Sequence, residues 1–280
     1  MRQVFVEQVF PGTPAAEAGI EPGDVIVSVE GESIAGVDSA EATAKIKGPE
    51  GTDVTIGVRD GRGGEVEQIT LTREEVRLPN VSSRIETVDG TKLGYVRLLA
   101  FSNGASKELK KAVERVQDDG AEGIVLDLRG NPGGLLGEAV RTASVFLPEG
   151  EVVVTTESRS QGRTVHETVG GNLPALPLVV LVDGGTASAA EILAAALEAD
   201  GGATVVGQRS FGKGVFQEEV GLANGGALKL TTGEYFTPEG VNLAESKGIQ
   251  PDVEVDDDPE TEADEEIQRA LQILAAQAGS

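Results

Sequence analysis

Short apolar runs and longer amphipathic stretches alternate along the second part of the chain. Leu178–Val182 and Ile124–Leu128 are continuous apolar runs, as is typical of strands buried on both faces. Lys107–Gln117 and Leu135–Leu147 are predicted to be helices, and so is the alanine-rich stretch Ser188–Glu198. Strands that alternate with helices in this way predict an α/β sheet with right-handed crossovers.

The first part of the chain shows a different pattern, in which short strands are separated by turns. Val25–Val29, Thr52–Arg59 and Val66–Arg73 are rich in β-branched residues and are predicted to be strands. A helix is predicted over Ser39–Ile46. Together these elements predict a small β-rich domain over residues 1–76, ahead of the α/β domain.

The C-terminal part is expected to leave the α/β core, which is predicted over residues 77–256. Asp256–Glu266 is an acidic run that predicts a solvated linker. Thr261 and Asp264 have the spacing of a capping box. The apolar face of a terminal helix is then formed by Ile267, Ala270, Leu271 and Leu274. Residues 257–280 are therefore predicted to form an acidic linker and a C-terminal helix, docked on the core or on a partner subunit.

Composition and charge narrow the classes of partner. The chain has 280 residues and a formal net charge of -24 at pH 7, which argues against nucleic acid and anionic membrane surfaces as partners. It contains no cysteine, so neither a disulfide nor a thiolate metal site can form. No apolar run reaches the roughly 18 residues of a membrane span, so no membrane insertion is expected. We also expect no signal peptide in this chain, because residues 1–20 lack its basic and apolar regions.

Ser188 is a candidate for chemistry because of where the pattern places it. The predicted strand Leu178–Val182 is broken by Asp183–Gly185, and the next helix begins at Ser188. The serine therefore follows a sharp turn from a strand into a helix N-terminus. Free backbone N–H groups at such a turn favour a developing negative charge. Ser188 is thus a candidate nucleophile, and a nucleophilic serine needs a base.

The chain offers a histidine and a lysine as candidate bases. His166, the only histidine, lies in a polar, glycine-flanked stretch that predicts an exposed hairpin, so a surface position is favoured for it. Lys213 lies between the apolar residues Phe211 and Phe216, and a lysine can act as a base where burial disfavours its charged form. Gln217 follows shortly afterwards and can orient the amine. We therefore favour Lys213 as the base.

These segments, in this order, resemble the carboxyl-terminal processing (tail-specific) peptidases, serine proteases with a Ser/Lys catalytic pair and a PDZ domain. GGTASAAEI contains Ser188, FGKGVFQ contains Lys213 and Gln217, and LDLRGNPGG covers Leu126–Gly134. The resemblance extends over nearly the whole chain. It implies a mixed α/β (α+β) protease core with a βαβ-type sheet, plus a small PDZ-like β-rich domain.

The resemblance also implies a role for each residue of these motifs. Ser188 would be the nucleophile of a serine endopeptidase that cleaves protein substrates near their C-termini. Lys213 would be its base, and Gln217 would assist the lysine. The oxyanion hole would be formed by backbone N–H groups of Ala189 and of one of two glycines, Gly133 or Gly134. No metal and no cofactor are implied.

Partners and location follow from the same resemblance. Protein or peptide substrates, bound through their C-termini, are the implied partners, and a homo-oligomer is compatible with it. Members of the family usually work outside the cytoplasm. An extracytoplasmic location in the periplasm, in the cell envelope or as a secreted protein is therefore implied.

Pro11–Gly31 is similar to the centre of a PDZ domain, a fold that binds a protein C-terminus as an added strand. The chain departs from the PDZ pattern before Val4, where the carboxylate-binding loop and the first strands would be expected. We therefore expect a PDZ-like domain in residues 1–76 that is truncated at its N-terminus. The helix Ser39–Ile46 would be the remaining wall of its peptide groove.

Two other motifs suggest different chemistry. Gly207, Gly212 and Lys213 nearly form a phosphate-binding loop, but Gly214 stands where a Ser or Thr should bind magnesium, which disfavours nucleotide binding. Ser210 and Lys213 have the S-x-x-K spacing found in penicillin-binding proteins. That motif lies at the start of a helix, and the neighbouring glycines argue against a helix here. Ser210 is therefore predicted to be structural.

Two acidic residues near these motifs receive no catalytic role. Asp127 is predicted to be a buried or turn-bonded carboxylate, and Glu191 is predicted to interact with the dipole of the helix that begins at Ser188. A different class of function stays open beside the peptidase. It is an inactive or resting protease-fold protein that acts as a PDZ-type peptide-binding or scaffold module.

Overall fold

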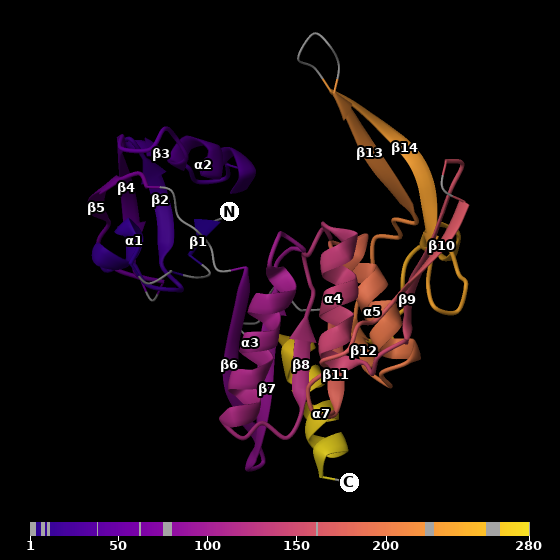
Figure 1. The fold of residues 1–280 in the computed structure, drawn as a ribbon. Coiled ribbons are helices and arrows are strands. Elements are labelled where there is room, and N and C mark those ends of the chain that lie inside the picture. Colours follow the sequence, from indigo (N-terminus) through magenta and orange to yellow (C-terminus); the bar gives the residue numbers. More distant parts are fainter. Residues whose placement is uncertain are drawn as a thin grey trace. The chain divides into compact units, whose positions relative to one another are not determined.

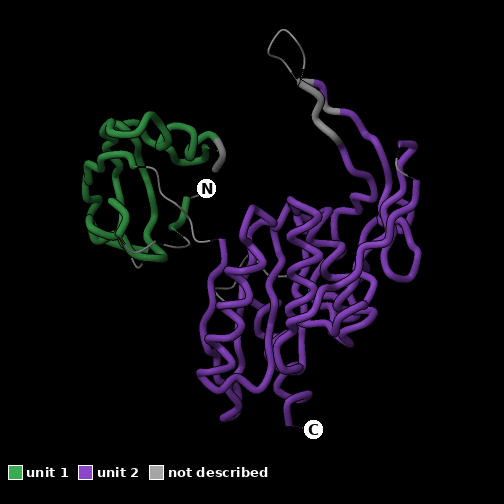
Figure 2. The backbone as a smooth tube through the Cα atoms, viewed as in Figure 1, with its two compact units in different colours: residues 1–79 green, residues 80–280 purple. Residues whose placement is uncertain are grey.

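The chain divides into two compact units, Met1–Pro79 (unit 1) and Asn80–Ser280 (unit 2), shown in Figure 2. Unit 1 has one sheet and one apolar cluster, and unit 2 has two sheets and two apolar clusters, among the described residues. Among the described residues, no helix is long and apolar enough to cross a membrane. This computed structural model describes residues 4–6, 9, 12–37, 39–61, 63–74, 80–160, 162–221, 227–255 and 264–279.

The described residues of unit 1 form a five-stranded antiparallel sheet and two helices. Glu30 and Gly31 join two of its strands with positive φ values of 52° and 78°, the geometry that a tight hairpin turn requires. The apolar core includes Ala42 of the second helix, Val54 of the sheet, and Ile34, which follows a short strand. The elements are β1 (Val4–Phe5), α1 (Pro14–Glu17), β2 (Val25–Val29), β3 (Glu32–Ser33), α2 (Ser39–Ile46), β4 (Asp53–Arg59) and β5 (Glu67–Thr72).

Unit 2 is organised around a six-stranded sheet with the order β15-β12-β11-β8-β7-β6. Its neighbouring strands are parallel except for β6, which pairs with β7 in the antiparallel direction. Every residue of β8 and β11 is buried, as their continuous apolar runs predict. The strands are β6 (Val81–Val88), β7 (Thr91–Leu98), β8 (Ile124–Asp127), β11 (Leu178–Val182), β12 (Thr204–Gly207) and β15 (Val253–Glu254).

Helices cover both faces of this sheet, which explains why its central strands are apolar throughout. Helices α3 (Ala105–Asp118), α4 (Leu136–Phe146) and α5 (Ala189–Ala199) lie on one face, and α7 (Glu265–Ala278) lies on the other (Figure 1). The helices α3 to α5 share one apolar cluster with the sheet, and α7 packs in a second one. The alternation of strands and helices confirms the predicted α/β class.

A second sheet of unit 2 has the order β10-β9-β14-β13. Its strands pair in the antiparallel direction, and the β13–β14 hairpin extends away from the α/β core (Figure 1). The short helix α6 (Leu243–Ser246) follows β14. The strands are β9 (Val152–Ser158), β10 (Gly162–Glu167), β13 (Val215–Gly221) and β14 (Ala227–Phe236).

Of the acidic run predicted to be a solvated linker, residues 256–263 lie outside the described residues, and the described end, Asp264–Glu266, is half-buried or buried at the start of α7. Asp264 caps α7 by accepting a hydrogen bond from the Ile267 backbone N–H (2.8 Å), and Glu266 is only 3% exposed. The physical reason is Arg129, which pairs with both carboxylates. Thr261, the other member of the predicted capping box, lies outside the described residues, and the cap of the helix is Asp264 itself.

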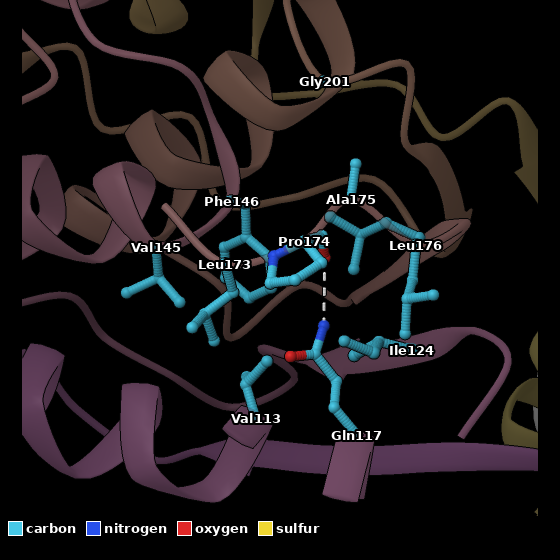
Figure 3. Close-up of a pocket in the computed structure, with 11 residues that line it drawn as sticks. Val113, Gln117, Ile124, Val145, Phe146, Leu173, Pro174, Ala175, Leu176 and Gly201 are labelled. Atoms are coloured by element: carbon cyan, nitrogen blue, oxygen red, sulfur yellow. Dashed lines mark hydrogen bonds between the residues drawn. The ribbon is translucent and has the colours of Figure 1, made fainter. Parts of the chain in front are cut away.

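A cavity of about 50 Å³ lies where residues 173–176 pass over α3 and α4. Figure 3 shows mostly apolar side chains around it, with Gln117 donating to the backbone carbonyl of Pro174 (3.0 Å). This volume holds roughly one water molecule. The cavity is therefore a small packing gap, and none of the candidate site residues lines it.

Candidate active site

Two turns meet at one edge of the main sheet because β8 and β11 are adjacent and parallel. The turn after β8 and the turn after β11 therefore begin side by side at the carboxyl ends of these strands. Three hydrogen bonds join them: Ala187 N–H donates to the Asn131 carbonyl (2.9 Å), Gly130 N–H donates to Oδ1 of Asp183 (2.8 Å), and the Thr186 hydroxyl donates to the Leu128 carbonyl (2.9 Å). The sheet topology thus brings together the two segments that the sequence singles out.

Ser188 has an unusual backbone conformation at the end of the turn after β11. Its φ is 59° and its ψ is -118°, and it directly precedes helix α5. A positive φ in a residue other than glycine costs on the order of 1–3 kcal/mol, and such residues gather at functional sites. The structure therefore places Ser188 at a strained strand-to-helix turn, at the N-terminus of a helix.

Gly133, in the turn after β8, packs directly against this serine. A Cβ atom at Gly133 would lie 2.8 Å from the Cβ of Ser188, 2.8 Å from the backbone N of Ala189 and 2.7 Å from the carbonyl oxygen of Ala187. These distances are shorter than any side chain tolerates, and the φ of Gly133 is 94°. Only glycine allows the two turns to approach so closely.

The three predicted oxyanion donors differ in their present partners. The Gly133 N–H donates to Oδ1 of Asn131 (2.9 Å), a fully buried side chain whose amide in turn donates to the Leu98 carbonyl. Within the described part of the chain, the backbone N–H groups of Gly134 and Ala189 donate no hydrogen bond. These two groups are therefore available to an incoming oxygen atom.

The carboxylate of Glu191 connects the segment of the candidate nucleophile with that of the candidate base. Its Oε2 accepts hydrogen bonds from the backbone N–H groups of Ser188 (2.8 Å) and Lys213 (3.0 Å). Its Oε1 accepts from the Gly212 N–H (2.7 Å) and from the Ser210 hydroxyl (2.5 Å). Glu191 is fully buried, and these four donors compensate for the loss of water around it.

Glu191 does more than interact with the helix dipole, which is the role that the sequence predicts for it. Its carboxylate fixes the backbone on both sides of the site, which a contact with the helix dipole alone would not do. The sequence did hold a signal, because Ser188-x-x-Glu191 is the spacing of a capping box. Ser210, which was predicted to be structural, donates to Glu191 and accepts from the Ile249 N–H.

The side chains of the two other predicted catalytic residues face a more open environment. Lys213 is half-buried and Gln217 is exposed, near the start of β13. Phe211, which was expected to help bury the lysine, is itself 66% exposed. Among the described residues, neither the Lys213 amine nor the Gln217 amide forms a hydrogen bond or an ion pair. The structure thus brings the backbone of Lys213 to the site without pairing its amine with Ser188.

His166 takes part in a different contact. It lies on β10, and its Nε2 shares a hydrogen bond with the Thr156 hydroxyl (2.9 Å) on β9. Partial burial lowers the pKa of its imidazole. The prediction of a hairpin is confirmed, and nothing in these contacts links His166 to Ser188.

Arg129 anchors the turn after β8 to helix α7 on the other face of the sheet. Its guanidinium pairs with Asp127 (2.8 Å), Asp264 (2.9 Å) and Glu266 (2.7 Å). Asp127 is fully buried and also accepts a hydrogen bond from the Tyr95 hydroxyl (2.5 Å), which confirms the prediction of a buried, turn-bonded carboxylate. The network fixes the turn that contains Gly133.

Fold and site together define a class of protein. In this class, a β-rich unit is combined with an α/β unit. The α/β unit presents a serine at a strained helix N-terminus, next to backbone N–H groups that donate no hydrogen bond within the described part of the chain. Comparison with known protein families identifies the class of this chain more narrowly. The model of peptidase family S41 matches residues 92–255, and a PDZ domain model matches residues 5–60.

Individual relatives agree with these family models. The chain is 37% identical over 271 residues to a carboxyl-terminal-processing protease of Picosynechococcus sp., with 95% of this chain and 65% of that protein covered. It is 38% identical over 281 residues to a protein of the same name in Synechocystis sp., with 97% and 65% covered. The chain thus spans 65% of the length of these curated relatives.

A solved structure of a related protease supports the same family assignment. The structure of a photosystem II D1 C-terminal processing protease matches with a TM-score of 0.60 and 32% identity, and the match covers 99% of this chain and 73% of that chain. The chain belongs to peptidase family S41 and carries a PDZ domain in unit 1. The predicted combination of an α/β protease core with a PDZ-like domain is therefore confirmed.

Proposed function

We propose that this chain is a serine endopeptidase in which Ser188 is the nucleophile, Lys213 the general base and Gln217 the residue that orients the lysine. The proposal depends mainly on the hydrogen bonds of Glu191. One oxygen atom of its carboxylate accepts hydrogen bonds from the backbone N–H groups of both Ser188 and Lys213. A buried carboxylate with this bonding keeps nucleophile and base in one site. Membership of a peptidase family supports the same assignment.

The reaction begins when the neutral amine of Lys213 takes the proton of the Ser188 hydroxyl. The Oγ atom then attacks the scissile carbonyl, and the negative charge moves to the carbonyl oxygen. We assign the N–H groups of Ala189 and Gly134 to this oxygen, because the Gly133 N–H already donates to Asn131. Losing one such donor costs on the order of 10²-fold in rate.

The leaving amine takes the proton back from Lys213, and an acyl group stays on Ser188. Lys213 then activates a water molecule, which hydrolyses this ester and regenerates the serine. No metal or cofactor takes part in this scheme. In this reaction scheme, Gln217 orients the lysine amine and takes part in no proton transfer.

The names of the relatives suggest the substrate. They are carboxyl-terminal-processing proteases, so we propose protein substrates that are cut near their C-termini, with the PDZ domain of unit 1 as the part that binds these ends. The same relationship suggests an extracytoplasmic location for the chain. These proposals concern the substrate class and leave the sequence of the cleavage site open.

A resting form of the peptidase is the second candidate. It is favoured by the lysine amine, which among the described residues makes no hydrogen bond to Ser188. In such a form the nucleophile, the turn and the Glu191 contacts are in place, and only the Lys213 side chain must move. Because that side chain is half-buried, it has room to do so.

The test compares degradation of an unstructured protein by the parent chain and by the variants Ser188→Ala and Lys213→Ala. We expect the parent to cut and both variants to lose activity by about 10⁴-fold or more, because each removes a group that makes or breaks bonds. Ser82→Ala and Lys107→Ala replace exposed residues away from the site and serve as matched controls.

The outcomes separate the candidates. Loss of cleavage in both site variants, with the controls unchanged, supports the Ser/Lys peptidase. A silent parent whose Ser188 still reacts with a fluorophosphonate is the resting form. A silent parent whose Ser188 does not react contradicts the peptidase proposal and leaves a binding module.

A further inference from the structure

Asn131 lies in the turn after β8, two residues before Gly133, and it is fully buried. Its Oδ1 accepts a hydrogen bond from the Gly133 N–H (2.9 Å), and its Nδ2 donates to the carbonyl of Leu98, the last residue of β7 (2.9 Å). A side-chain amide suits this position because it accepts a hydrogen bond at one end and donates one at the other. The side chain of Asn131 therefore ties the turn to the neighbouring strand.

The backbone of Asn131 reaches the turn of the candidate nucleophile. Its carbonyl accepts the N–H of Ala187 (2.9 Å), the residue before Ser188. One residue thus joins the end of β7, the turn after β8 and the turn after β11. A shift of Asn131 would displace both of the turns that supply the candidate oxyanion donors.

The peptide group between Gly133 and Gly134 has a defined direction. Its carbonyl accepts the N–H of Phe101 (3.0 Å), and the N–H of Leu135 donates back to the carbonyl of Phe101 (2.8 Å). The C=O and N–H bonds of a trans peptide point in opposite directions, so the Gly134 N–H points away from Phe101. Among the described residues, this N–H donates no hydrogen bond.

Two consecutive glycines hold such a direction only if their neighbours restrain them. Gly133 and Gly134 have φ values of 94° and 145°, and glycine adopts other conformations about as readily. The Gly133 N–H is bound by Asn131, and the Gly133 carbonyl is bound by Phe101. The pair is therefore restrained on one side by a buried side chain and on the other by a backbone segment.

We propose that Asn131 is the positioning residue of the oxyanion hole. It binds the Gly133 N–H, which leaves the Gly134 N–H as the donor and fixes the direction in which that donor points. Asn131 is buried and acts through Gly134 and, by its contact with Ala187, through the turn that carries Ala189. Donors that are already in place stabilise the developing negative charge without reorienting during the reaction. The proposal rests on the peptidase function argued above.

The test compares Asn131→Ala with Asn131→Ser in the full chain. Both variants lose the contact with Leu98, but a serine hydroxyl can accept the N–H two residues on, more weakly than asparagine does. We expect kcat on an unstructured protein and the rate of fluorophosphonate labelling to fall about 10²-fold in Asn131→Ala and about tenfold in Asn131→Ser. KM should stay within about twofold of the parent, because the donors act on the transition state. The difference between the variants measures the bond to Gly133.

The same two substitutions at Asn80 are the matched controls. The amide of Asn80 also donates to a carbonyl (2.9 Å) and accepts an N–H (3.0 Å), but both groups belong to Ala100. We expect Asn80→Ala and Asn80→Ser to melt at a lower temperature than the parent, because backbone groups lose their partners, and to keep kcat and labelling within about twofold. A merely structural role for Asn131 would give the same result at both positions.

The proposal is supported if kcat falls in the Asn131 variants alone, with KM unchanged and serine better than alanine. It is overturned by equal kcat in Asn131→Ala and Asn131→Ser, by a rise in KM with kcat unchanged, or by equal losses of kcat in the Asn80 variants. Each of these results leaves the peptidase function standing.

Two further outcomes have a defined meaning. If Asn131→Ala does not fold, Asn131→Ser is compared with Asn80→Ser: a loss of kcat in the first alone supports the proposal, and equal kcat overturns it. If the parent itself neither cuts nor labels, and equals Ser188→Ala in this, the peptidase function fails and the role of Asn131 fails with it.

Discussion

Gly133 is one of the residues at which the two turns of the site touch. A methyl group there would collide with backbone atoms of Ala187 and Ala189, and these atoms cannot move aside as a flexible side chain can. The positive φ of 94° adds strain for any other residue. Gly133→Ala should therefore separate the turns by a few tenths of an ångström and misplace the nucleophile.

We expect Gly133→Ala to label with a fluorophosphonate about 10²-fold more slowly and to lose about 1–3 kcal/mol of unfolding free energy. Labelling rates and denaturant titrations measure both effects. Gly184→Ala is the matched control in the neighbouring turn, since a Cβ there meets no atom within 4 Å. Similar losses in the two variants would show that close packing at Gly133 is not what the site requires.

At this scale the sequence predicts which groups carry chemistry but not how they are held. Ser188, Lys213 and Gln217 could be named because each lies in a local motif. The contacts of Glu191 with Ser210, Gly212 and Lys213 cross between a helix and a distant loop, and a pattern along the chain does not reveal such pairing.

Helix α3 depends on a neighbouring helix for its N-terminal cap. The residue before it is Gly104, which has no side chain to accept a hydrogen bond. Glu138 of α4 accepts instead from the backbone N–H groups of Gly104 (3.1 Å) and Ser106 (2.9 Å), and from Arg141. Burial raises the pKa of Glu138, but hydrogen bonds from the Ser106 hydroxyl, from Arg141 and from these backbone N–H groups outweigh it and lower the pKa to about 2.

Glu138→Gln tests this cap through its pH dependence. The folded pKa of about 2 lies below the ordinary value of about 4.5, so the ionised carboxylate stabilises the fold above about pH 4.5 and the effect disappears as the pH falls towards 2. We expect the variant to lose about 1–3 kcal/mol of unfolding free energy near neutral pH. The difference from the parent should shrink in acid.

Denaturant titrations at about pH 7 and about pH 3 measure this difference. Glu122→Gln changes an exposed glutamate in the segment that follows the C-terminus of α3, and it should match the parent at both pH values. A loss for Glu138→Gln that is equally large at both pH values would contradict the assignment of its low pKa to the cap.

The sequence predicts the helices and strands whose apolar residues recur with a clear period. It does not predict elements that are only partly buried. The fully buried strands β8 and β11 and the helices α3 to α5 occur where apolar spacing predicts them. Strand β6 was not predicted, because it lies at the edge of its sheet and its residues alternate between partial and full exposure. The burial of Glu266 was hidden as well, because an acidic run gives no indication that Arg129 will pair with it.

At the scale of the whole molecule, all the proposed catalytic groups lie in one unit. Unit 2 contains Ser188, Lys213 and Gln217, and its two apolar clusters include no residue of unit 1. Unit 1 has an apolar cluster of its own. The catalytic unit therefore has what it needs to fold and to position its nucleophile without the PDZ domain.

We predict that residues 80–280 alone fold cooperatively and that Ser188 in them labels with a fluorophosphonate within about tenfold of the rate in the full chain. Circular dichroism melting and labelling kinetics check this, with Ser188→Ala in the same shortened chain as the control for specific reaction. Cleavage of long protein substrates should fall further than labelling, because capture of substrate C-termini is the part proposed for unit 1. If the shortened chain folds but Ser188 no longer labels, unit 1 acts on the catalytic turn itself and not only on substrate capture.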